Sequence, residues 1–448
     1  MGKSKSNILI IAPCYSVNRP PLGISLLSGF LKERRFDCKT IDLNAECYLG
    51  SDKKHLWEPQ NFYKWIEENS FYEEIFIDIK DLIDNKVDYI TTEAPDVVGL
   101  SVFSTNIFCS LYIAKRLKEK NDNIKIVFGG PHMKSFVGGK NEKFFSVADF
   151  IVYSEGEQAY LDIVKGEKRP SGVIAKDKLF ETEVSYIDGK DFPMPDLDLF
   201  RENQYKLKNS FSYMYGRGCP NECAYCEETN IYRGYRHVNE KEFKRHLKIF
   251  KNQGIKTLYF SDSQVNPSEK IFNDFICSLE DGLRYQGNLF AFDWVKRKHI
   301  SDLSSKGFEK ITIGVESCSK RILRRMNKPL SVIKVLRILK WAKDHNIKVK
   351  LNFIVGFPSE KWSDVLWTMF FILVFSYYSP QISPVASTCS ALSGSRIYKK
   401  PDEYFIKHLD TIDFIEENGN DIVYREKKKK VFNAFIFILK KIGILPSV

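Results

Sequence analysis

The chain has 448 residues, of which 43% are hydrophobic and 28% are charged, and this composition excludes a mainly disordered or fibrous protein. The net charge of +11 is a mild surplus for this length, so we expect no nucleic-acid partner. Ten cysteines are too sparse for a disulfide scaffold, and the first residues run into a strand-like segment rather than a signal peptide. We therefore expect a cytoplasmic α/β enzyme with two or three domains.

Residues 1–157 alternate short β-branched runs with segments of helical period. We predict five strands in this region, at 8–12, 38–42, 97–103, 124–128 and 150–153. Helices are expected between them, notably over 20–32 and 107–120. This alternation predicts a doubly wound parallel sheet of the flavodoxin or Rossmann kind, in which ligands bind at the carboxyl ends of the strands.

The loops after these strands are rich in small residues, which suits a large, flat ligand lying over the edge of the sheet. They are Ala12-Pro13-Cys14-Tyr15, Ser104-Thr105-Asn106, Gly129-Gly130-Pro131-His132 and Ser154-Glu155-Gly156-Glu157. No GxGxxG or P-loop pattern occurs, so a dinucleotide or a nucleoside triphosphate is not the favoured occupant. Taken alone, these loops leave the ligand open.

Residues 158–205 are predicted to form a connector. They hold a helical piece, a hairpin expected over 172–183, and two prolines at 193 and 195 that are typical of a domain boundary. A second domain is expected over 206–400, followed by a helical, basic and apolar extension over 401–448.

The second domain opens with a strand expected over 211–215 and then three cysteines, Cys219, Cys223 and Cys226, spaced C-x3-C-x2-C. A closed zinc site or an electron-transfer cluster needs four ligands. Three thiolates on a [4Fe–4S] cluster would leave one iron open to a substrate or cofactor. Two alternatives remain: a zinc site completed by His237 or a distant cysteine, and a redox pair of Cys223 and Cys226.

This cysteine loop, with Tyr225 before its last cysteine, resembles that of the radical S-adenosylmethionine (SAM) superfamily. The resemblance extends to strands expected at 258–263, 289–294, 310–317, 348–358 and 381–388, separated by helices, and it implies a partial (β/α)6 barrel. The N-terminal domain, with its GGPH and EGE loops, resembles the cobalamin-binding domain of one large branch of that superfamily.

The resemblance implies that Cys219, Cys223 and Cys226 ligate the cluster and that SAM chelates its open iron. The residues then expected to hold SAM are Tyr225, Ser261, Asp262, Glu316, Val355 and Gly356. Asp262 would accept a hydrogen bond from the SAM ammonium, Glu316 would bind the ribose, and Val355 with Gly356 would pack on adenine. As an alternative, either carboxylate caps the following helix, which is the role expected for Glu360.

For cobalamin, Gly129 and Gly130 are expected to let the backbone approach the corrin. The side chains expected to hydrogen-bond its amides are Ser101, Thr105 and Glu155. The D-x-H-x-x-G signature, whose histidine replaces the lower axial ligand in many cobalamin proteins, is absent, and His132 is expected to be a hydrogen-bonding or surface residue.

With both cofactors, the reaction implied by the resemblance is methylation of an unactivated carbon or phosphorus, using methylcobalamin and a 5′-deoxyadenosyl radical. The alternatives are a radical SAM enzyme that catalyses cyclisation or oxidative rearrangement, with or without cobalamin, and a non-catalytic zinc-binding protein. The expected partners are a small-molecule, peptide or lipid-like substrate and an electron donor such as flavodoxin or ferredoxin.

Two apolar segments bear on membrane contact. Residues 365–380 carry no charge but fall short of the ~20 residues that span a bilayer. The tail at 427–445 mixes lysines with an apolar face, so it either packs on the domain or rests on anionic lipid. The second alternative predicts peripheral contact with the inner face of the membrane.

Overall fold

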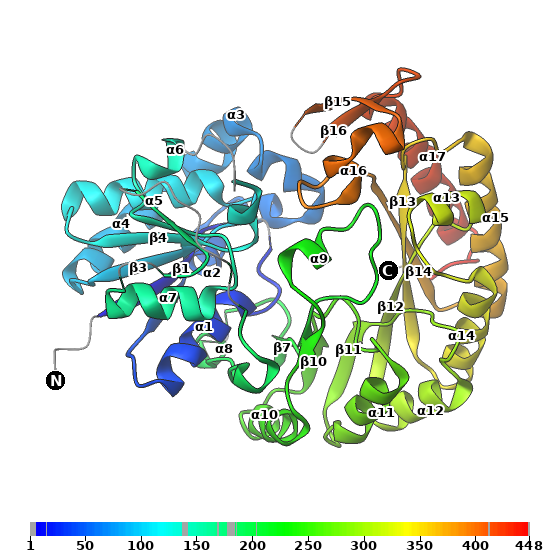
Figure 1. The fold of residues 1–448 in the computed structure, drawn as a ribbon, viewed down its shortest axis with the longest axis horizontal. Helices are drawn as coiled ribbons and strands as arrows, with labels where there is room; N and C mark the ends of the chain where they lie inside the picture. The colour runs from blue at the N-terminus through cyan, green and yellow to red at the C-terminus, as the bar shows by residue number, and fades with distance from the viewer. Residues whose placement is uncertain are drawn as a thin grey trace. The chain divides into compact units, whose positions relative to one another are not determined.

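The computed structural model describes residues 6–446 apart from 15, 137–141, 168–169, 177–183, 185, 203 and 411–412. The chain divides into two compact units, Met1–Ser212 and Tyr213–Val448. Each unit is built around its own six-stranded sheet (Figure 1). The first unit therefore takes in the residues expected to form a connector.

The sheet of the first unit has the strand order β2-β1-β3-β4-β5-β6. Its strands are β1 (Asn7–Ile11), β2 (Lys39–Asp42), β3 (Val97–Ser101), β4 (Lys125–Gly129), β5 (Phe150–Val152) and β6 (Val173–Ala175). The first five run parallel, in the order of flavodoxin-like domains, which confirms the predicted doubly wound sheet. The strand β6 pairs antiparallel with β5, whereas the rest of the expected hairpin, 177–183, lies outside the described residues.

Helices cover both faces of this sheet (Figure 1). On one face α2 and α5 both pack against α4, and on the other α1 packs against α7. The helices are α1 (Leu22–Glu33), α2 (Leu43–Gly50), α3 (Glu68–Ser70), α4 (Ile77–Thr92), α5 (Ile107–Lys120), α6 (Glu142–Phe145), α7 (Gly156–Lys165) and α8 (Asp198–Arg201), with short turns η1 (Lys54–Trp57), η2 (Pro59–Trp65), η3 (Phe71–Phe76), η4 (Pro131–Phe136) and η5 (Gly189–Asp191). The aromatic segment between α2 and α4 extends the core with buried Trp57, Trp65 and Phe71.

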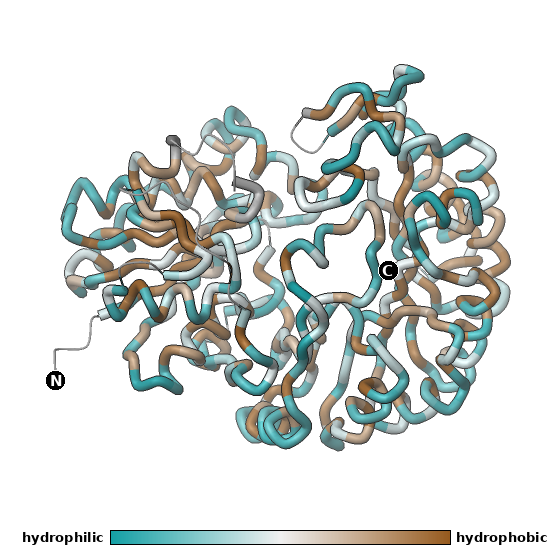
Figure 2. Tube along the Cα trace, viewed as in Figure 1, coloured by the Kyte–Doolittle hydropathy of each residue, from teal (hydrophilic) through white to brown (hydrophobic). Residues whose placement is uncertain are grey.

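The sheet of the second unit has the order β14-β13-β12-β11-β10-β7, which is an open, partial barrel. Its strands are β7 (Ser210–Tyr213), β10 (Thr257–Phe260), β11 (Arg284–Asn288), β12 (Phe308–Glu316), β13 (Lys348–Val355) and β14 (Ile382–Thr388). All the registers from β10 to β14 are parallel. The expected partial barrel is therefore confirmed. Figure 2 shows both brown and teal segments in this unit, because buried apolar residues alternate with polar ones along strands such as β13.

One strand prediction in the barrel is wrong. The strand expected at 289–294 lies at β11, Arg284–Asn288, just before it. The apolar run that suggested a strand forms a buried loop beyond its end, where the side chain of Asn266 pairs with both backbone groups of Phe290 at 2.8 Å. The strand itself has a modest β-propensity, because it contains no β-branched residue and has a glycine in its interior. That glycine, Gly287, lies where a Cβ would come within 3.1 Å of Cβ of Phe260.

Helices line the outer side of the barrel (Figure 1). They are α10 (Glu240–Asn252), α11 (Glu269–Ser278), α12 (Arg297–Ser305), α13 (Lys320–Arg325), α14 (Val332–Asp344), α15 (Trp362–Tyr378) and α17 (Ile422–Lys441), with shorter elements α9 (Glu228–Ile231), α16 (Arg396–Lys399) and η6 (Pro401–Tyr404). Two small antiparallel pairs complete the unit: β8 (Gly216–Arg217) with β9 (Arg236–His237), and β15 (Ile406–Asp410) with β16 (Asp413–Glu416). No helix among the described residues is long and apolar enough to cross a bilayer.

Candidate active site

The three cysteines lie on one loop, directly after β8 at the carboxyl edge of the barrel. A Cβ at Gly218, whose φ is +91°, would come within 1.9 Å of the carbonyl oxygen of Gly234, so only glycine fits at the start of this loop. Cys219, Cys223 and Cys226 are half-buried, and burial raises the pKa of each thiol, that of Cys226 to about 11. The Sγ of Cys226 also accepts the backbone N–H of Glu228 at 3.4 Å.

This loop fits an iron–sulfur cluster by the chemistry of its donors, because soft thiolates are the ligands that such clusters take. In the part of the chain that is described, no group of three or more His, Cys, Asp and Glu side chains could hold a metal ion as it stands. The buried Nε2 of Gln264 lacks a hydrogen-bond partner within the described residues, while its Oε1 accepts from Asn221 of the cysteine loop at 3.4 Å. An unpartnered amide beside the loop is consistent with a site that a bound group completes.

Glu316, at the end of β12, is tied to the cysteine loop. Its Oε1 accepts hydrogen bonds from the hydroxyl of Tyr225 at 3.1 Å and from Nζ of Lys328 at 2.9 Å, and Lys328 also donates to the Tyr225 hydroxyl at 3.0 Å. Both charged side chains are buried. Glu316 and Tyr225 are both predicted from the sequence to lie at the SAM site. Lys328 is not, since a single lysine between a helix and a proline carries no distinguishing signal.

The backbone at Glu316 is strained. Its φ is +64°, a region that non-glycine residues rarely adopt, and the register between β12 and β13 shifts at this point. The side chain folds back over Gly314, where a Cβ would lie 2.4 Å from Oε1. The chain therefore holds this carboxylate in one position, which is typical of functional sites.

Asp262, after β10, has a different set of partners from the one expected. It is fully buried, and its two carboxylate oxygens accept the backbone N–H groups of Tyr215 at 3.0 Å and Gly216 at 2.5 Å. Burial raises the pKa of Asp262 to about 7, although the two amide hydrogen bonds act in the opposite direction. Asp262 thus anchors the segment that leads into the cysteine loop, and its contact with SAM stays a prediction. Ser261 lies beside it and donates its backbone N–H to Tyr213.

The loop after β13 is supported by the C-terminal helix α17. Gly356 has a φ of +81°, and a Cβ on it would lie 2.7 Å from Cγ of Arg425. The Arg425 side chain therefore leaves no room for any residue larger than glycine at this position. The Oε2 of Glu360 accepts the N–H of Gly356 at 2.7 Å and lies 3.7 Å from Nζ of Lys428. Glu360 therefore closes the loop rather than capping α15, whose first turn is capped by Asp364.

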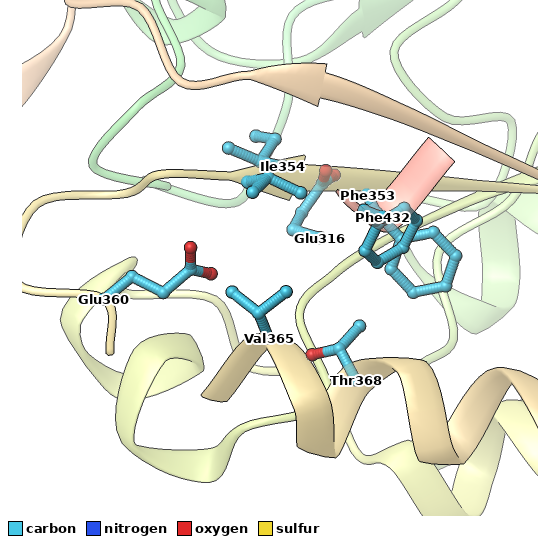
Figure 3. A pocket seen from close by; sticks show the side chains of 8 residues that line it. Glu316, Phe353, Ile354, Glu360, Val365, Thr368 and Phe432 are labelled. Atoms are coloured by element: carbon cyan, nitrogen blue, oxygen red, sulfur yellow. The ribbon is translucent and has the colours of Figure 1, made fainter. Parts of the chain in front are cut away.

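Behind this loop is a narrow gap between side chains, lined by Glu316, Phe353, Ile354, Val355, Glu360, Val365, Thr368 and Phe432 (Figure 3). It has no room for a water-sized molecule, so it is not a ligand pocket. Figure 3 shows the carboxylate of Glu316 pointing away from Val365 and Thr368 of α15. The packing of Val355 and Gly356 on adenine also stays a prediction.

In the first unit, the residues expected at the cobalamin site lie at the carboxyl ends of three neighbouring strands. Ser101 ends β3 and Thr105 follows it, Gly129 ends β4 and Gly130 follows it, and Glu155 follows β5. A Cβ at Gly130 would lie 2.7 Å from the carbonyl oxygen of Val102, and the space beside Gly129 is open except for Val152. Gly130 is therefore required by the close approach of the Val102 backbone, whereas the open space beside Gly129 leaves room for a bound group at this edge.

Two side chains in these loops have structural partners. The carboxylate of Glu155 accepts the N–H of Ile187 at 3.0 Å. Asn106, which was not among the expected site residues, donates to the carbonyl oxygens of Ala12 and Ser101 and so joins the loops after β1 and β3. This is the point where the strand order reverses and where such sheets bind ligands. Burial lowers the pKa of His132.

Residues 213–372 match the family model of the radical SAM superfamily, and residues 66–164 match that of the B12 binding domain. The chain is a radical SAM enzyme with a B12-binding domain. These two family matches imply a [4Fe–4S] cluster and SAM for the second unit and cobalamin for the first. The predicted resemblance to both families is therefore confirmed, and a non-catalytic zinc protein is excluded.

Two curated relatives of this radical SAM enzyme show the range of its family. An uncharacterized methyltransferase of Pyrococcus horikoshii is 25% identical over 376 residues, which are 79% of this chain and 72% of the relative. The anaerobic magnesium-protoporphyrin IX monomethyl ester cyclase of Rubrivivax gelatinosus is 25% identical over 323 residues, 66% of this chain and 58% of the cyclase.

Two solved structures share the fold of this radical SAM enzyme. The cobalamin-dependent S-adenosylmethionine radical enzyme OxsB, with aqua-cobalamin and S-adenosylmethionine bound, has a TM-score of 0.70 at 16% identity and covers 97% of this chain and 67% of its own. The radical S-adenosylmethionine methyltransferase TsrM from Kitasatospora setae has a TM-score of 0.65 at 13% identity, with coverages of 91% and 79%. At such identities the likeness shows the fold alone.

Proposed function

We propose that this enzyme is a cobalamin-dependent radical SAM methyltransferase that methylates an unactivated carbon or phosphorus. The observation that carries the proposal is the presence of a B12-binding domain and a radical SAM domain in one chain. A relative named as a methyltransferase matches 79% of the chain, and a methyltransferase structure shares its fold.

When bound, the cofactors supply a carbon-centred radical that removes a hydrogen atom from the substrate and a methyl group that replaces it. The chain's own residues have three tasks. Cys219, Cys223 and Cys226 would hold the cluster, with the fourth iron left for SAM. Glu316, whose carboxylate accepts hydrogen bonds from Tyr225 and Lys328, would orient SAM. The third task is to keep water away from the reacting groups, which would protect a reactive radical.

Cyclisation or oxidative rearrangement is the second candidate, since a cyclase matches 66% of the chain. The two reactions differ in how SAM is consumed. A methyltransferase of this kind needs a methyl group from one SAM and a radical from another, so it forms S-adenosylhomocysteine as well as 5′-deoxyadenosine. A cyclase needs the radical alone.

The test is to purify the protein anaerobically with hydroxocobalamin, reconstitute the cluster, and add SAM with a strong reductant or a flavodoxin or ferredoxin system. We expect about four irons and one cobalt per chain and formation of both SAM products. Loss of S-adenosylhomocysteine in protein prepared without cobalamin would tie methyl transfer to that cofactor. Formation of 5′-deoxyadenosine alone by the cobalamin-loaded protein would contradict the proposal and favour the cyclase alternative.

A further inference from the structure

The helix α15 has an uncovered apolar face. Val365, Thr368, Ile372 and Phe375 pack inward, whereas the opposite side exposes a stripe at helical spacing. That stripe comprises Leu366 (56% exposed), Trp367 (51%), Phe370 (51%), Leu373 (38%) and Tyr377 (81%). A helix that is apolar on all sides is normally buried in a core or in lipid. Contiguous exposed apolar residues of this size mark an interaction site.

The C-terminal helix α17 continues this face. It packs against α15, and the rings of Trp362 and Tyr424 meet in an edge contact 6.4 Å apart. On its uncovered side α17 exposes Val431, Phe437 and Ile438 together with Lys427, Lys430 and Lys441. The sequence holds no acidic residue from 365 to 380 or from 427 to 441. We call these exposed residues of the two helices the α15–α17 face.

The charge of this face selects among its candidate occupants. A second copy of the chain docked on the same face would bring lysines against lysines, which is unfavourable at close range. An anionic lipid surface instead attracts them, which strengthens partitioning about fivefold for each lysine. Tryptophan and tyrosine are also the aromatic residues that favour the boundary between lipid and water. The 17 residues of α15 make a helix about 25 Å long, short of the ~30 Å hydrocarbon core.

We propose that the α15–α17 face docks on the surface of a bilayer that contains anionic phospholipid, with α15 lying in the plane of the interface. The apolar stripe enters the boundary between headgroups and acyl chains, while the lysines remain at the level of the phosphates. This attachment is independent of the reaction that the barrel catalyses.

Vesicle flotation of the full-length, cofactor-loaded protein tests the proposal. Vesicles of phosphatidylcholine alone are compared with vesicles containing one quarter phosphatidylglycerol, at low and high salt. We expect binding to the anionic vesicles that weakens with salt. Trp367→Ser with Phe370→Ser should abolish it, and Lys427→Glu with Lys430→Glu should weaken partitioning by at least about thirtyfold.

Matched controls lie elsewhere on the chain. Tyr63→Ser with Ile77→Ser removes from the first unit two apolar residues that are at least as exposed, and Lys241→Glu with Lys248→Glu makes the same charge change on α10. Both should float as the wild type does, and all variants should keep their iron and cobalt content, which shows that they fold. Equal binding to both vesicle types, or unchanged binding by the α15 variant, would overturn the proposal. So would a dimer in light scattering that this variant converts to a monomer without any vesicle binding by the wild type.

Discussion

At the scale of single residues, the pair of Glu316 and Lys328 is the most sensitive feature of the site. Both are buried, and they lie 2.9 Å apart. Replacing Lys328 with methionine leaves a buried carboxylate without its cation, which typically costs about 3–5 kcal/mol. We expect Lys328→Met to lower the melting temperature and to slow formation of 5′-deoxyadenosine, measured by calorimetry and by chromatography.

The double variant Glu316→Gln with Lys328→Met separates stability from function. It removes both charges, so most of the lost stability should return, whereas SAM cleavage should remain impaired because the carboxylate is missing. If the single Lys328→Met change leaves both stability and SAM cleavage as in the wild type, the pair has no role in the site.

The raised pKa of Asp262 predicts that the stability of the protein depends on pH. Burial raises its pKa to about 7 in the folded protein, above the ordinary value of 3.8. The folded state therefore binds a proton more tightly than the unfolded state, so the stability that this group contributes is complete below about pH 4 and is lost as the pH rises through about 7. Urea unfolding of the apo proteins should show that the free energy of unfolding of the wild type exceeds that of Asp262→Asn by less and less as the pH rises over this range. A difference that stays constant with pH would contradict a raised pKa for Asp262.

At the scale of elements, the contact between α17 and the loop after β13 is testable at Gly356. Gly356→Ala combines a positive φ with a clash against Arg425, and we expect it to cost about 1–3 kcal/mol and to reduce SAM binding. Gly254→Ala is the matched control, because Gly254 has the same φ of +81° with nothing within 4 Å of the added Cβ. Thermal melts and equilibrium dialysis of SAM give the comparison. Equal losses for the two variants would mean that Arg425 is not the cause.

The elements that could be predicted from sequence are those with a strong local pattern. The helix at 107–120 was placed at its observed bounds, and four of the five barrel strands expected after the cysteine loop overlap their observed ranges because each is a clear apolar run. The position of β11 was predicted wrongly because the strand is polar and is followed by an apolar run, and because the contact of Gly287 with Phe260 of the neighbouring strand is visible only in the folded chain. Local propensity carries no information on such a contact.

The residues of the candidate site also differ in whether a local sequence pattern reveals them. The cysteine loop is recognisable because its three chemical groups lie within eight residues of sequence. The partners that fix the other groups come from distant segments: Lys328 lies 103 residues after Tyr225, and Lys428 lies 68 residues after Glu360. Asp262 was expected to face SAM, and only the folded backbone shows that amides of the preceding segment occupy its oxygens.

At the scale of the whole molecule, the two family matches fall in separate units of the chain. Loss of one cofactor should therefore leave the other in place. We expect Cys226→Ala to lose the four irons and SAM cleavage while it retains cobalt at about one per chain. Cys277→Ala, at an exposed cysteine on α11, is the control and should retain both metals. Elemental analysis measures this, and loss of cobalt together with iron would show that the sites depend on each other.

Because the backbone of Glu316 is strained, thermal stability and activity place opposite demands on this position when the enzyme is engineered. A φ of +64° costs a non-glycine residue about 1–3 kcal/mol, whereas glycine adopts it freely. Laboratory evolution that rewards heat resistance alone should thus favour glycine at this position once Lys328 has been exchanged for an apolar residue. Such a variant would be more stable to heat but would lack the Glu316 carboxylate that the proposed reaction uses. Each round of selection therefore needs an activity screen as well as a thermal one.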